Sequence, residues 1–562
     1  MQLQFDLPAR IGKDAYQYGE RSSGETHGVV LTKPHVVNLI LDLARYTPDR
    51  ALTSMRILEP ACGTGAFLVP AVERLLTGAR RDGVKAADLG QHVVAYDIDP
   101  EHVAASRSAV VKVLQGQEVP TRVARRLAEQ WVREGDFLLA QDGPFDVVIG
   151  NPPYIRIEQL SPSLQAEYRR RYTSLYDRAD LYVAFIERGL DLLKPDGVLS
   201  FICADRWILN RYGAPLRKRV NERFKVHAYI DLHQASPFES EVIAYPSIFA
   251  IGPGKSERVL VGSMLTATPE ECAAMQQAMH DGKASHSGVS VAVHETWFQG
   301  DDPWVLSSPL HLETLRLLES RFPSLEADGT TRVRIGVATG NDKIFIVNED
   351  VDIEPSRLVP LVKREDIHQG RIEDAKRFVI NTFDAQGKLI DLARYPRLAR
   401  YLDSHEDSIR KRHVAQKNSA GWFRTIDRVY PELVSVPKLL VPDIAGSNEV
   451  AFDEGRFHPH HNLYFIISDV WDMEVLGGLL SSKVALFFIW SYAVKMRGGY
   501  LRFQAQYLRR IRLPRPNDIP ASLKNSIRRA FRKRDFKKID ELALKAYDLK
   551  ALPDFDFVDT RT

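Results

Sequence analysis

The chain has few cysteines, no long apolar run and no excess of charge of one sign. Its three cysteines, Cys62, Cys203 and Cys272, are too far apart to form a disulfide framework or a typical set of metal ligands, so we expect no metal site. No stretch approaches the roughly 18 apolar residues of a membrane span. The N-terminus lacks the charged and apolar regions of a signal peptide. These absences predict a cytoplasmic protein without membrane contact.

The charges almost balance, with 76 Lys and Arg against 73 Asp and Glu. A surface for nucleic acid must therefore be local rather than spread over the whole protein. We find no internal repeat and no low-complexity tract. Apolar residues make up 44% of the sequence, which is typical of globular proteins, and 562 residues are too many for one ordinary core. We expect two or three domains.

The most informative stretch is Asn151-Pro152-Pro153-Tyr154, which directly follows the strand-like run 145–150. A buried parallel strand that ends at Asn151 places this residue at the carboxyl edge of a sheet, where open α/β folds bind ligands. The prolines cannot continue the strand and fix their own φ angles, so the Asn side chain and the Pro152 carbonyl are held firmly. Two acceptors beside an aromatic ring suit a planar amine attached to a ring. The alternative is a loop that merely ends a strand.

A glycine turn precedes this stretch. Residues 56–59 read as a short strand ending at Glu59, and a turn with Gly63 and Gly65 leads into a helix. The glycines allow the backbone to approach a ligand closely. The Gly-x-Gly spacing lacks the third glycine of a dinucleotide fingerprint, which disfavours a pyrophosphate. A small ligand with its ammonium group near Glu59 fits better, although a purely structural turn remains the alternative.

Acidic residues end the next two expected strands. Residues 93–97 read as a strand whose last residue, Asp97, is placed to accept both hydroxyls of a ribose. Asp99 is followed by Pro100 and is expected to be a helix N-cap.

In the segment 133–139, Asp136 is placed to bond an exocyclic amine and Phe137 to flank an adenine ring, with an ordinary polar turn as the alternative. Glu59, Asp97 and Asp136 together describe a site for an adenosine with an amino-acid tail.

An earlier segment, 27–44, contains Thr32 as the expected cap of a helix with Pro34 in its first turn. Taken together and in this order, the motifs resemble the S-adenosylmethionine-dependent DNA adenine-N6 methyltransferases of the gamma class, with TaqI-type architecture. The resemblance covers most of the sequence from Tyr18 to Gly252. It implies S-adenosyl-L-methionine as cofactor, bound by the glycine turn with Gly63 and Gly65 and by Thr32, Glu59, Ala61, Asp97, Ile98, Asp136, Phe137 and Phe185. For Phe185, an aromatic of the core is an equally good interpretation.

The resemblance also implies the catalytic residues. The Asn151 side-chain oxygen and the Pro152 carbonyl would accept the two amine protons, Pro153 would stiffen the loop, and Tyr154 would stack on the target base. The segment 236–240 resembles the family's loop whose aromatic stacks on the opposite face, so Phe238 is the expected partner. Tyr245 is near enough in sequence to compete for that role.

The implied fold class is α/β. A Rossmann-like methyltransferase domain with a mixed, mostly parallel sheet is expected over residues 1–255, and a connecting segment over 256–330. A C-terminal α+β target-recognition domain with a basic helical tail is expected over 331–562, because segments such as 334–347 and 438–443 resemble the TaqI-type specificity domain. DNA contacts are expected at Arg497, Arg502, Arg509, Arg510 and Arg512. The basic face of 524–545 is either a phosphate-binding surface or a solvated charged face.

The expected reaction is transfer of a methyl group to N6 of a flipped-out adenine in double-stranded DNA, in a restriction-modification or phage-defence system. No convincing Pro-Asp…Glu-x-Lys nuclease pattern occurs, so we expect a monomeric modification enzyme with a separate cognate restriction endonuclease. The alternatives are a protein glutamine methyltransferase, an RNA adenine methyltransferase, and a catalytically inactive DNA-binding relative. A cytosine-N4 enzyme is disfavoured because its motif usually begins with serine.

Overall fold

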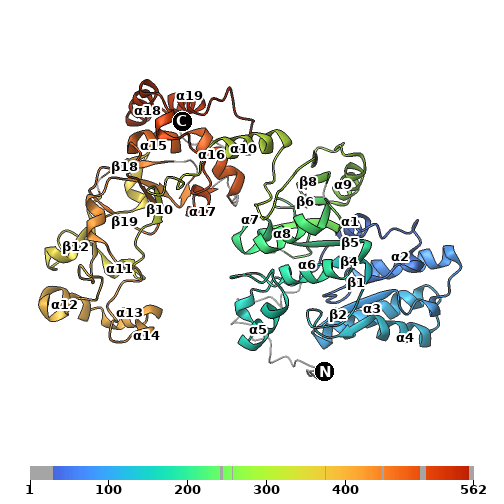
Figure 1. Cartoon of the computed structure of the whole chain (residues 1–562). Helices are drawn as coiled ribbons and strands as arrows, with labels where there is room; N and C mark the ends of the chain where they lie inside the picture. The colour runs from blue at the N-terminus through green and yellow to red at the C-terminus, as the bar shows by residue number, and fades with distance from the viewer. Residues whose placement is uncertain are drawn as a thin grey trace, which may run out of the picture. The chain divides into compact units, whose positions relative to one another are not determined.

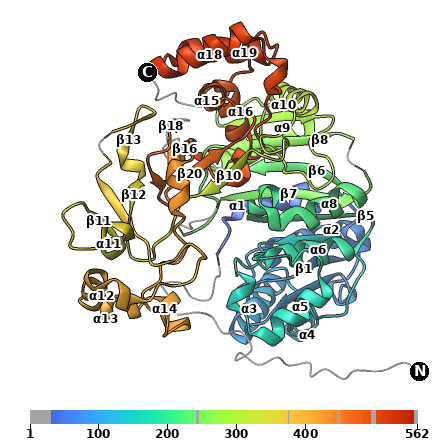
Figure 2. The same cartoon turned by 60° about the vertical axis from the view of Figure 1, so that its left-hand side comes forward.

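In a computed structural model of the chain, the structure describes residues 30–240, 245–255, 257–373, 375–445, 449–493 and 501–555. The chain forms two compact units, Met1–Pro309 and Leu310–Thr562. The first is coloured blue to green and the second yellow to red (Figures 1 and 2). Each unit has its own sheets and helices, as expected for a chain of two domains.

The N-terminal unit contains a nine-stranded sheet in the order β3-β2-β1-β4-β5-β7-β6-β8-β9. Among these strands only β7 and β9 run against the others, which confirms the expected mixed, mostly parallel sheet. The strands are β1 Ile57–Glu59, β2 Val93–Asp97, β3 Val132–Glu134, β4 Phe145–Gly150, β5 Leu193–Ala204, β6 Phe224–Asp231, β7 Pro246–Pro253, β8 Val259–Met264 and β9 Val289–His294.

Helices pack on both faces of this sheet. Alternate strand residues such as Ile57, Val93 and Val147 share one apolar core with α1 (Pro34–Leu43), α2 (Leu68–Asp82), α3 (Pro100–Gly116), α4 (Thr121–Trp131) and α9 (Pro269–Asp281). On the other face, α6 (Tyr182–Asp191) lies so close that a Cβ on Gly189 would meet Leu199 at 2.6 Å. The remaining helices of the unit are α5 Pro162–Arg171, α7 Arg206–Leu209 and α8 Ala214–Arg223. A sheet covered on both faces exposes only its edges and strand ends to ligands.

The strand order reverses between β1 and β4. Ile57 pairs with Val147, and Leu58 with Val148, so these two strands end side by side. A Cβ on Gly150, the last residue of β4, would lie 3.8 Å from the Glu59 side chain. Open α/β sheets bind ligands at such a switch point, outside the carboxyl ends of the strands. The fold therefore brings Glu59 and Asn151 to one place.

Two helix starts test the expected caps. Asp99 caps α3, and its side chain accepts the N–H of Glu101 at 2.9 Å, as predicted. Thr32 does not cap α1, because the N-cap is Lys33 and no side chain bonds the first turn. The backbone of Lys33 instead donates to the Pro237 carbonyl, and Thr32 forms a β-bridge with Phe238. The proline fits the first turn without a side-chain cap.

The expected connecting segment, 256–330, is divided differently in the structure. Strands β8 and β9 add to the sheet of the N-terminal unit, and α9 packs against α1. The glycine-containing stretches that suggested a linker are turns at the ends of elements: Gly282, with φ 70°, is the C-cap of α9. The second unit begins with α10 (Pro309–Arg321). Glycine marks the end of a helix as readily as a domain boundary, which is why the composition misled.

The C-terminal unit is α+β. Its two four-stranded sheets have the orders β10-β20-β16-β18 and β11-β15-β12-β19. The strands of the first sheet are β10 Arg332–Ile335, β20 Leu463–Ile467, β16 Lys438–Pro442 and β18 Ala451–Asp453, and those of the second are β11 Ile346–Asn348, β15 Arg377–Ile380, β12 Leu358–Val362 and β19 His458–Pro459. Short helices, α12 Pro396–Asp403, α13 Glu406–Arg410 and α14 His413–Lys417, follow β15.

Four further helices of this unit pack together: α15 Met473–Leu480, α16 Lys483–Tyr492, α18 Ala521–Lys533 and α19 Phe536–Ala546. In the described part of the chain no single helix is long and apolar enough to cross a membrane, and the bent pair α15 and α16 meets that test only when taken together. Both helices contact α19, so their apolar side chains belong to a packed core.

A buried ion pair lies in the first of these sheets. The ammonium group of Lys438 donates to Asp453 Oδ2 at 2.8 Å, and both side chains are 0% exposed. Lys438 also donates to the Phe457 carbonyl at 3.0 Å, while Asp453 accepts the N–H groups of Arg456 and Phe457. The two charges are thus surrounded by partners within the protein itself.

Candidate functional site

The glycine turn between β1 and α2 begins the site. Gly63 (φ 51°) and Gly65 (φ 99°) take left-handed conformations that other residues adopt rarely. The N–H of Gly63 donates to Asp97 Oδ2 at 2.8 Å, and its carbonyl accepts the Ser106 hydroxyl at 2.8 Å. A Cβ on Gly65 would lie 3.3 Å from that hydroxyl oxygen. The turn is therefore fixed from two sides, by the end of β2 and by α3.

Asp97 lies at the carboxyl end of β2, as expected. Its Oδ1 accepts the N–H of Asp99 at 2.9 Å and lies 3.2 Å from Nδ1 of His102. With the bond from Gly63, both carboxylate oxygens have donors within the protein. These donors fix the direction of the carboxylate, and each oxygen keeps lone pairs for further donors.

Asp136 and Phe137 form the third side. Asp136 Oδ1 accepts the N–H of Leu138 at 2.8 Å, and Oδ2 accepts the hydroxyl of Tyr168, on α5, at 2.6 Å. The Phe137 ring lies 5.4 Å from the Phe185 ring of α6. The two aromatic rings contact each other next to a fixed carboxylate and form an apolar wall against which a flat, polar ring system can lie.

Glu59 is the acid without partners in the described structure. It is 3% exposed, and its Oε2 has no hydrogen-bond partner among the described residues. Burial raises the pKa of Glu59 well above its ordinary value, and the nearby charge of Asp97 raises it further. A buried carboxylate oxygen is costly unless a cation or donor reaches it. The geometry favours a ligand with a positive group at this point.

Asn151 directly follows β4 and presents its amide oxygen. Its Nδ2 donates to the Val30 carbonyl at 3.1 Å and lies 3.4 Å from Thr32 Oγ1. Because the Val30 carbonyl can only accept, it fixes which end of the amide is nitrogen. Oδ1 is buried and has no partner among the described residues. The side chain is therefore set to accept a hydrogen bond from a ligand.

Tyr154 ends the same loop. Its ring is partly exposed and lies 6.4 Å from the ring of Tyr182, while its hydroxyl oxygen is buried. Burial raises the pKa of Tyr154 well above its ordinary value, so the hydroxyl stays protonated. The Tyr182 hydroxyl bonds that of Tyr212 at 2.7 Å, which in turn donates to Asp180 at 2.9 Å. These hydrogen bonds hold the Tyr182 ring, against which Tyr154 packs.

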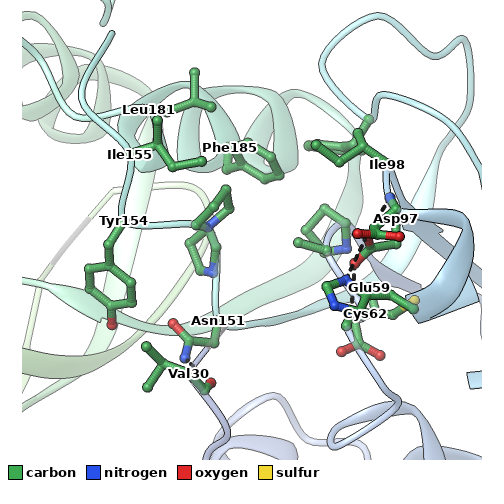
Figure 3. A pocket seen from close by; sticks show the side chains of 18 of the residues that line it. Val30, Glu59, Cys62, Asp97, Ile98, Asn151, Tyr154, Ile155, Leu181 and Phe185 are labelled. Atoms are coloured by element: carbon green, nitrogen blue, oxygen red, sulfur yellow. Dashed lines mark hydrogen bonds and ion pairs between the residues drawn. The ribbon is translucent and has the colours of Figure 1, made fainter. Parts of the chain in front are cut away.

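These residues surround one cavity of about 330 Å³ (Figure 3). Figure 3 shows Glu59 and Asp97 toward one end and Asn151 and Tyr154 toward the other, with Phe185 between them. The lining includes these predicted residues: Thr32, Glu59, Ala61, Gly63, Asp97, Ile98, Asp136, Phe137, Asn151, Pro152, Pro153, Tyr154 and Phe185. Gly65 shapes the turn from behind and is not part of the lining.

Phe238 is the predicted residue that the structure does not bring to the cavity. It is 6% exposed and packs in the core that α1 and α9 share. The neighbouring Glu239 donates its N–H to the Leu31 carbonyl, which continues the bridge at Thr32. A ring held in this core cannot also stack on a ligand. Its competitor Tyr245 is partly exposed, and its ring lies 5.0 Å from that of His233.

Several residues that line the cavity were not predicted from the sequence. Val30, Phe67, His102, Tyr168 and Leu181 all face the cavity. Val30 precedes the expected helix and carries no polar side chain, so only its backbone carbonyl gives it a role. His102 stands one helical turn after Asp99, a spacing that could have indicated a position above Asp97. Tyr168 carries no such signal.

The expected DNA-binding arginines have partners in the C-terminal unit. Arg502 bonds Asp443 at 2.9 Å, and Arg509 bonds Glu326 at 3.0 Å. The guanidinium of Arg510 lies over the Tyr492 ring. Arg512 pairs with Ser324 through its backbone alone, and its buried Nε has no partner among the described residues. Arg497 lies outside the described residues. Their expected contact with DNA stays a prediction.

The basic helix α18 is partly engaged as well. Arg528 pairs with Asp472 at 2.6 Å, and Arg532 with Glu474 at 2.6 Å. Both acids lie at the start of α15, where negative charge is favourable. These ion pairs attach α18 to α15, so part of the basic face of α18 has a structural role that requires no nucleic acid.

One group of side chains has the composition of a cation site. Asp342, His460 and His461 lie with their ligand atoms within 4.8 Å of one another. Nε2 of His460 is 2.8 Å from Asp342 Oδ2, and its Nδ1 faces the N–H of Asn462 at 3.4 Å. Both nitrogens of this ring are thus engaged within the protein.

The sequence matches two known families. Residues 95–238 match the Eco57I restriction-modification methylase model, and residues 362–513 match the TaqI-like C-terminal specificity domain. The first match includes Asp97, Asp136 and the loop of Asn151, and the second lies within the C-terminal unit.

The chain is similar to proteins of the same size. It is 43% identical over 541 residues to the Type II methyltransferase M.BstVI of Geobacillus stearothermophilus, which covers 93% of this chain and 96% of that protein. It is 44% identical to the Type II methyltransferase M.PaeR7I of Pseudomonas aeruginosa, over 93% of this chain and 92% of that one. Among solved structures, the Type IIL restriction-modification enzyme MmeI in complex with DNA superposes with a TM-score of 0.59 at 12% identity, over 93% of this chain and 73% of that one. That likeness shows a shared fold.

Proposed function

We propose that this chain, which belongs to the Type II methyltransferases of restriction-modification systems, methylates N6 of an adenine everted from duplex DNA. Proteins of this family use S-adenosyl-L-methionine as the methyl donor. The single observation that carries this proposal is the Asn151 side chain. Its amide nitrogen is occupied by Val30, and its buried oxygen, which faces the cavity, has no partner among the described residues.

The residues at the other end of the cavity fit the cofactor. Glu59 would meet the ammonium group, because its buried Oε2 has no partner among the described residues. Asp97 would accept the ribose hydroxyls, and the adenine would lie against the wall that Phe137 and Phe185 form, with Asp136 at its edge. When bound, the cofactor supplies a methyl group on a positively charged sulfur.

Asn151 would act on the amine of the target base. The N6 lone pair of adenine is delocalised into the ring, which makes this nitrogen a poor nucleophile. Hydrogen bonds from its two protons to Asn151 Oδ1 and the Pro152 carbonyl would favour a tetrahedral nitrogen and free the lone pair. No strong base is required, so catalysis consists of alignment and electrostatic stabilisation. The proline-stiffened loop supplies the alignment.

Tyr154 would hold the base itself. Enzymes that modify a base in DNA extrude it from the helix, at a cost of a few kcal/mol. Stacking on an aromatic side chain returns about 1–3 kcal/mol per base. The Tyr154 ring is partly exposed and is backed by Tyr182, so it offers one firm face. The C-terminal unit, which matches a specificity domain, would choose the sequence that is modified.

The test is to incubate the purified protein with cofactor labelled in its methyl group and with duplex DNA, RNA or protein in separate reactions. We expect label in duplex DNA, and N6-methyladenine after enzymatic hydrolysis to nucleosides. N4-methylcytosine in its place would overturn the assignment to adenine, and label in RNA or protein alone would overturn DNA as the substrate. Modification-sensitive sequencing of DNA from an expressing host would then give the recognition sequence.

A further inference from the structure

The segment after the catalytic loop alternates between buried and exposed side chains. Ile155 and Ile157 are 7% and 0% exposed, while Arg156 between them is exposed. The segment is extended and pairs with residue 180: Leu181 N–H donates to the Ile155 carbonyl at 2.7 Å, and Arg156 bridges Asp180. Since Ile155 and Leu181 line the cavity, Arg156 stands on the outer side of the same wall.

Arg206 comes to the same place from the neighbouring strand. β5 lies beside β4 in the sheet, and Arg206 follows its carboxyl end. Arg156 is joined to Asp180 by the β-bridge, and Tyr212, which follows Arg206 after one short helix, donates to the Asp180 carboxylate at 2.9 Å. Burial raises the pKa of Asp180, while the bond from Tyr212 and the positive charges of Arg206 and Arg156 oppose that rise. The sheet topology thus gathers the two arginines at the target end of the cavity.

Arg211 completes the group. Its neighbour Tyr212 donates to Asp180 at 2.9 Å. Arg211 itself is exposed, donates to the Tyr176 hydroxyl at 3.2 Å and lies 5.9 Å from the centre of that ring. Tyr176 is 44% exposed. We call Arg156, Arg206 and Arg211 the rim arginines.

The acids near this group leave it positive. Asp180 faces Arg156, Arg206 and Tyr212, and it contributes one negative charge against three positive ones. Glu158 is nearby but lies 3.8 Å from the guanidinium of Arg178, which is 87% exposed. The rim arginines therefore form a local basic surface on a chain whose total charge is almost balanced.

We propose that the rim arginines bind the backbone phosphates on either side of the everted nucleotide. This inference rests on the eversion assumed in the proposed function. When a base enters the cavity, its own sugar and the adjoining phosphates stay at the entrance. The planar guanidinium group matches a phosphate with two parallel hydrogen bonds, and Asp180 and Tyr176 hold two of these groups in position. The methyltransferase unit thereby binds the backbone of the target strand through contacts of its own, in addition to those of the specificity domain.

The first experiment measures affinity for a duplex that carries the recognition sequence, without cofactor, as a function of salt, by fluorescence anisotropy. Each lost phosphate contact lowers the slope of log affinity against log salt by about 0.9. We expect this decrease in Arg156→Gln, Arg206→Gln and Arg211→Gln, with affinity about tenfold lower at low salt. Arg125→Gln is the matched control, since Arg125 is exposed on α4, which packs against β2 and β3 at one edge of the sheet, whereas the rim arginines follow the central strands β4 and β5.

The result is read against two further checks. Arg156→Lys keeps the charge and should restore the slope, while thermal melting verifies that each variant is folded. A wild-type slope in folded Arg156→Gln would overturn the proposal. Because no methyl transfer is measured, this outcome is independent of whether N6 of adenine is the site of methylation.

The second experiment places the contact. The duplex carries the sequence that sequencing identifies, with one phosphate beside the target nucleotide replaced by an uncharged methylphosphonate. We expect this replacement to weaken binding about tenfold in the wild type and to have little additional effect in Arg156→Gln, because the two changes remove one contact. Fully additive losses at both flanking phosphates would show that Arg156 binds neither of them, and would overturn the proposal.

Discussion

Two groups of buried polar side chains, one in each unit, differ in how completely their atoms are paired. Lys438 and Asp453 are both 0% exposed, and each bonds the other and nearby backbone groups. Glu59 and Asn151 are also embedded in their unit, but each has a buried oxygen without a partner among the described residues. A buried polar atom without a partner costs about 1–3 kcal/mol. Because Glu59 and Asn151 also line the cavity, we expect a ligand to supply the missing partners. The first group stabilises a fold, and the second is available for chemistry.

Asp97 lies between these extremes. Its oxygens have donors in the chain, yet it also lines the cavity. The internal bonds fix the carboxylate, and its remaining lone pairs face the ligand. Burial alone therefore does not separate a structural acid from a binding one. The distinction depends on whether all of the acceptor capacity is used inside the protein.

The largest expected effect is on methyl transfer in Asn151→Ala. Removal of the amide oxygen should slow transfer about a thousandfold or more, equivalent to about 4 kcal/mol, because the amine loses a fixed acceptor. Single-turnover transfer of a labelled methyl group measures this loss. Calorimetric titration with the cofactor should show unchanged binding; a variant that transfers at the wild-type rate would contradict the role of Asn151.

Removing one charge of the buried pair Lys438 and Asp453 should affect stability instead of methyl transfer. Asp453→Ala leaves the Lys438 ammonium buried and unpaired, so the free energy of unfolding of the C-terminal unit should fall by about 3–4 kcal/mol. Denaturant unfolding measures this change. The double variant Lys438→Met with Asp453→Asn removes both charges and keeps an acceptor for the backbone, so it should recover at least half of the loss. Equal instability of both variants would show that the charge is not the cause.

Glu59→Gln removes the negative charge that Glu59 would carry beside a bound ammonium group. Affinity for the cofactor should fall about thirtyfold, equivalent to about 2 kcal/mol, because the ammonium group loses a charged hydrogen-bond partner. Glu134→Gln serves as control, since Glu134 ends β3, which β2 separates from the strand of Glu59, and is exposed. Equal affinity of the Glu59 and Glu134 variants would contradict the placement of the ammonium group.

The raised pKa of Glu59 predicts a proton release. Between the ordinary value of 4.5 and the raised pKa, the free protein holds this carboxyl protonated. Its contribution to stability is therefore present below 4.5 and is lost as pH rises through the raised pKa. An ammonium group favours the ionised form, so cofactor binding in this range should release up to about one proton. Calorimetry in buffers of different ionisation enthalpy measures the release, which should be absent in Glu59→Gln.

The smallest expected effect concerns an exposed pair, which sharpens the contrast with Lys438 and Asp453. Arg528 and Asp472 are 2.6 Å apart, but their side chains are 31% and 36% exposed. Arg528→Ala should lower the free energy of unfolding by about 0.5 kcal/mol, since water competes with the pair. A loss as large as that of Asp453→Ala would mean that α18 depends on this contact for its docking.

Much of the lining of the cavity could be predicted from the sequence. Strand runs that stop at Glu59, Asp97 and Asn151 determine which side chains meet, because parallel strands end at one edge of the sheet. The order of the strands brings these residues together, and the glycine turn indicates the close approach. Local pattern and fold agree at these positions.

The features of the site and fold that were not predicted depend on contacts between residues far apart in the sequence. Val30 fixes Asn151 through its backbone carbonyl, which no side-chain pattern reveals. Thr32 has the composition of a helix cap, but its segment pairs with 237–239 instead, and the same pairing keeps Phe238 in the core. For β8 and β9, short strands between glycine turns did not show which sheet they would join. Tertiary pairing decides such cases.

The most direct test of the account is a crystal structure of the protein with S-adenosyl-L-homocysteine and a duplex that contains its recognition sequence. We predict an everted adenine whose N6 lies within hydrogen-bond distance of Asn151 Oδ1, with its ring stacked on Tyr154. A complex in which Asn151 Oδ1 faces protein or solvent while the target base lies elsewhere would contradict the central claim.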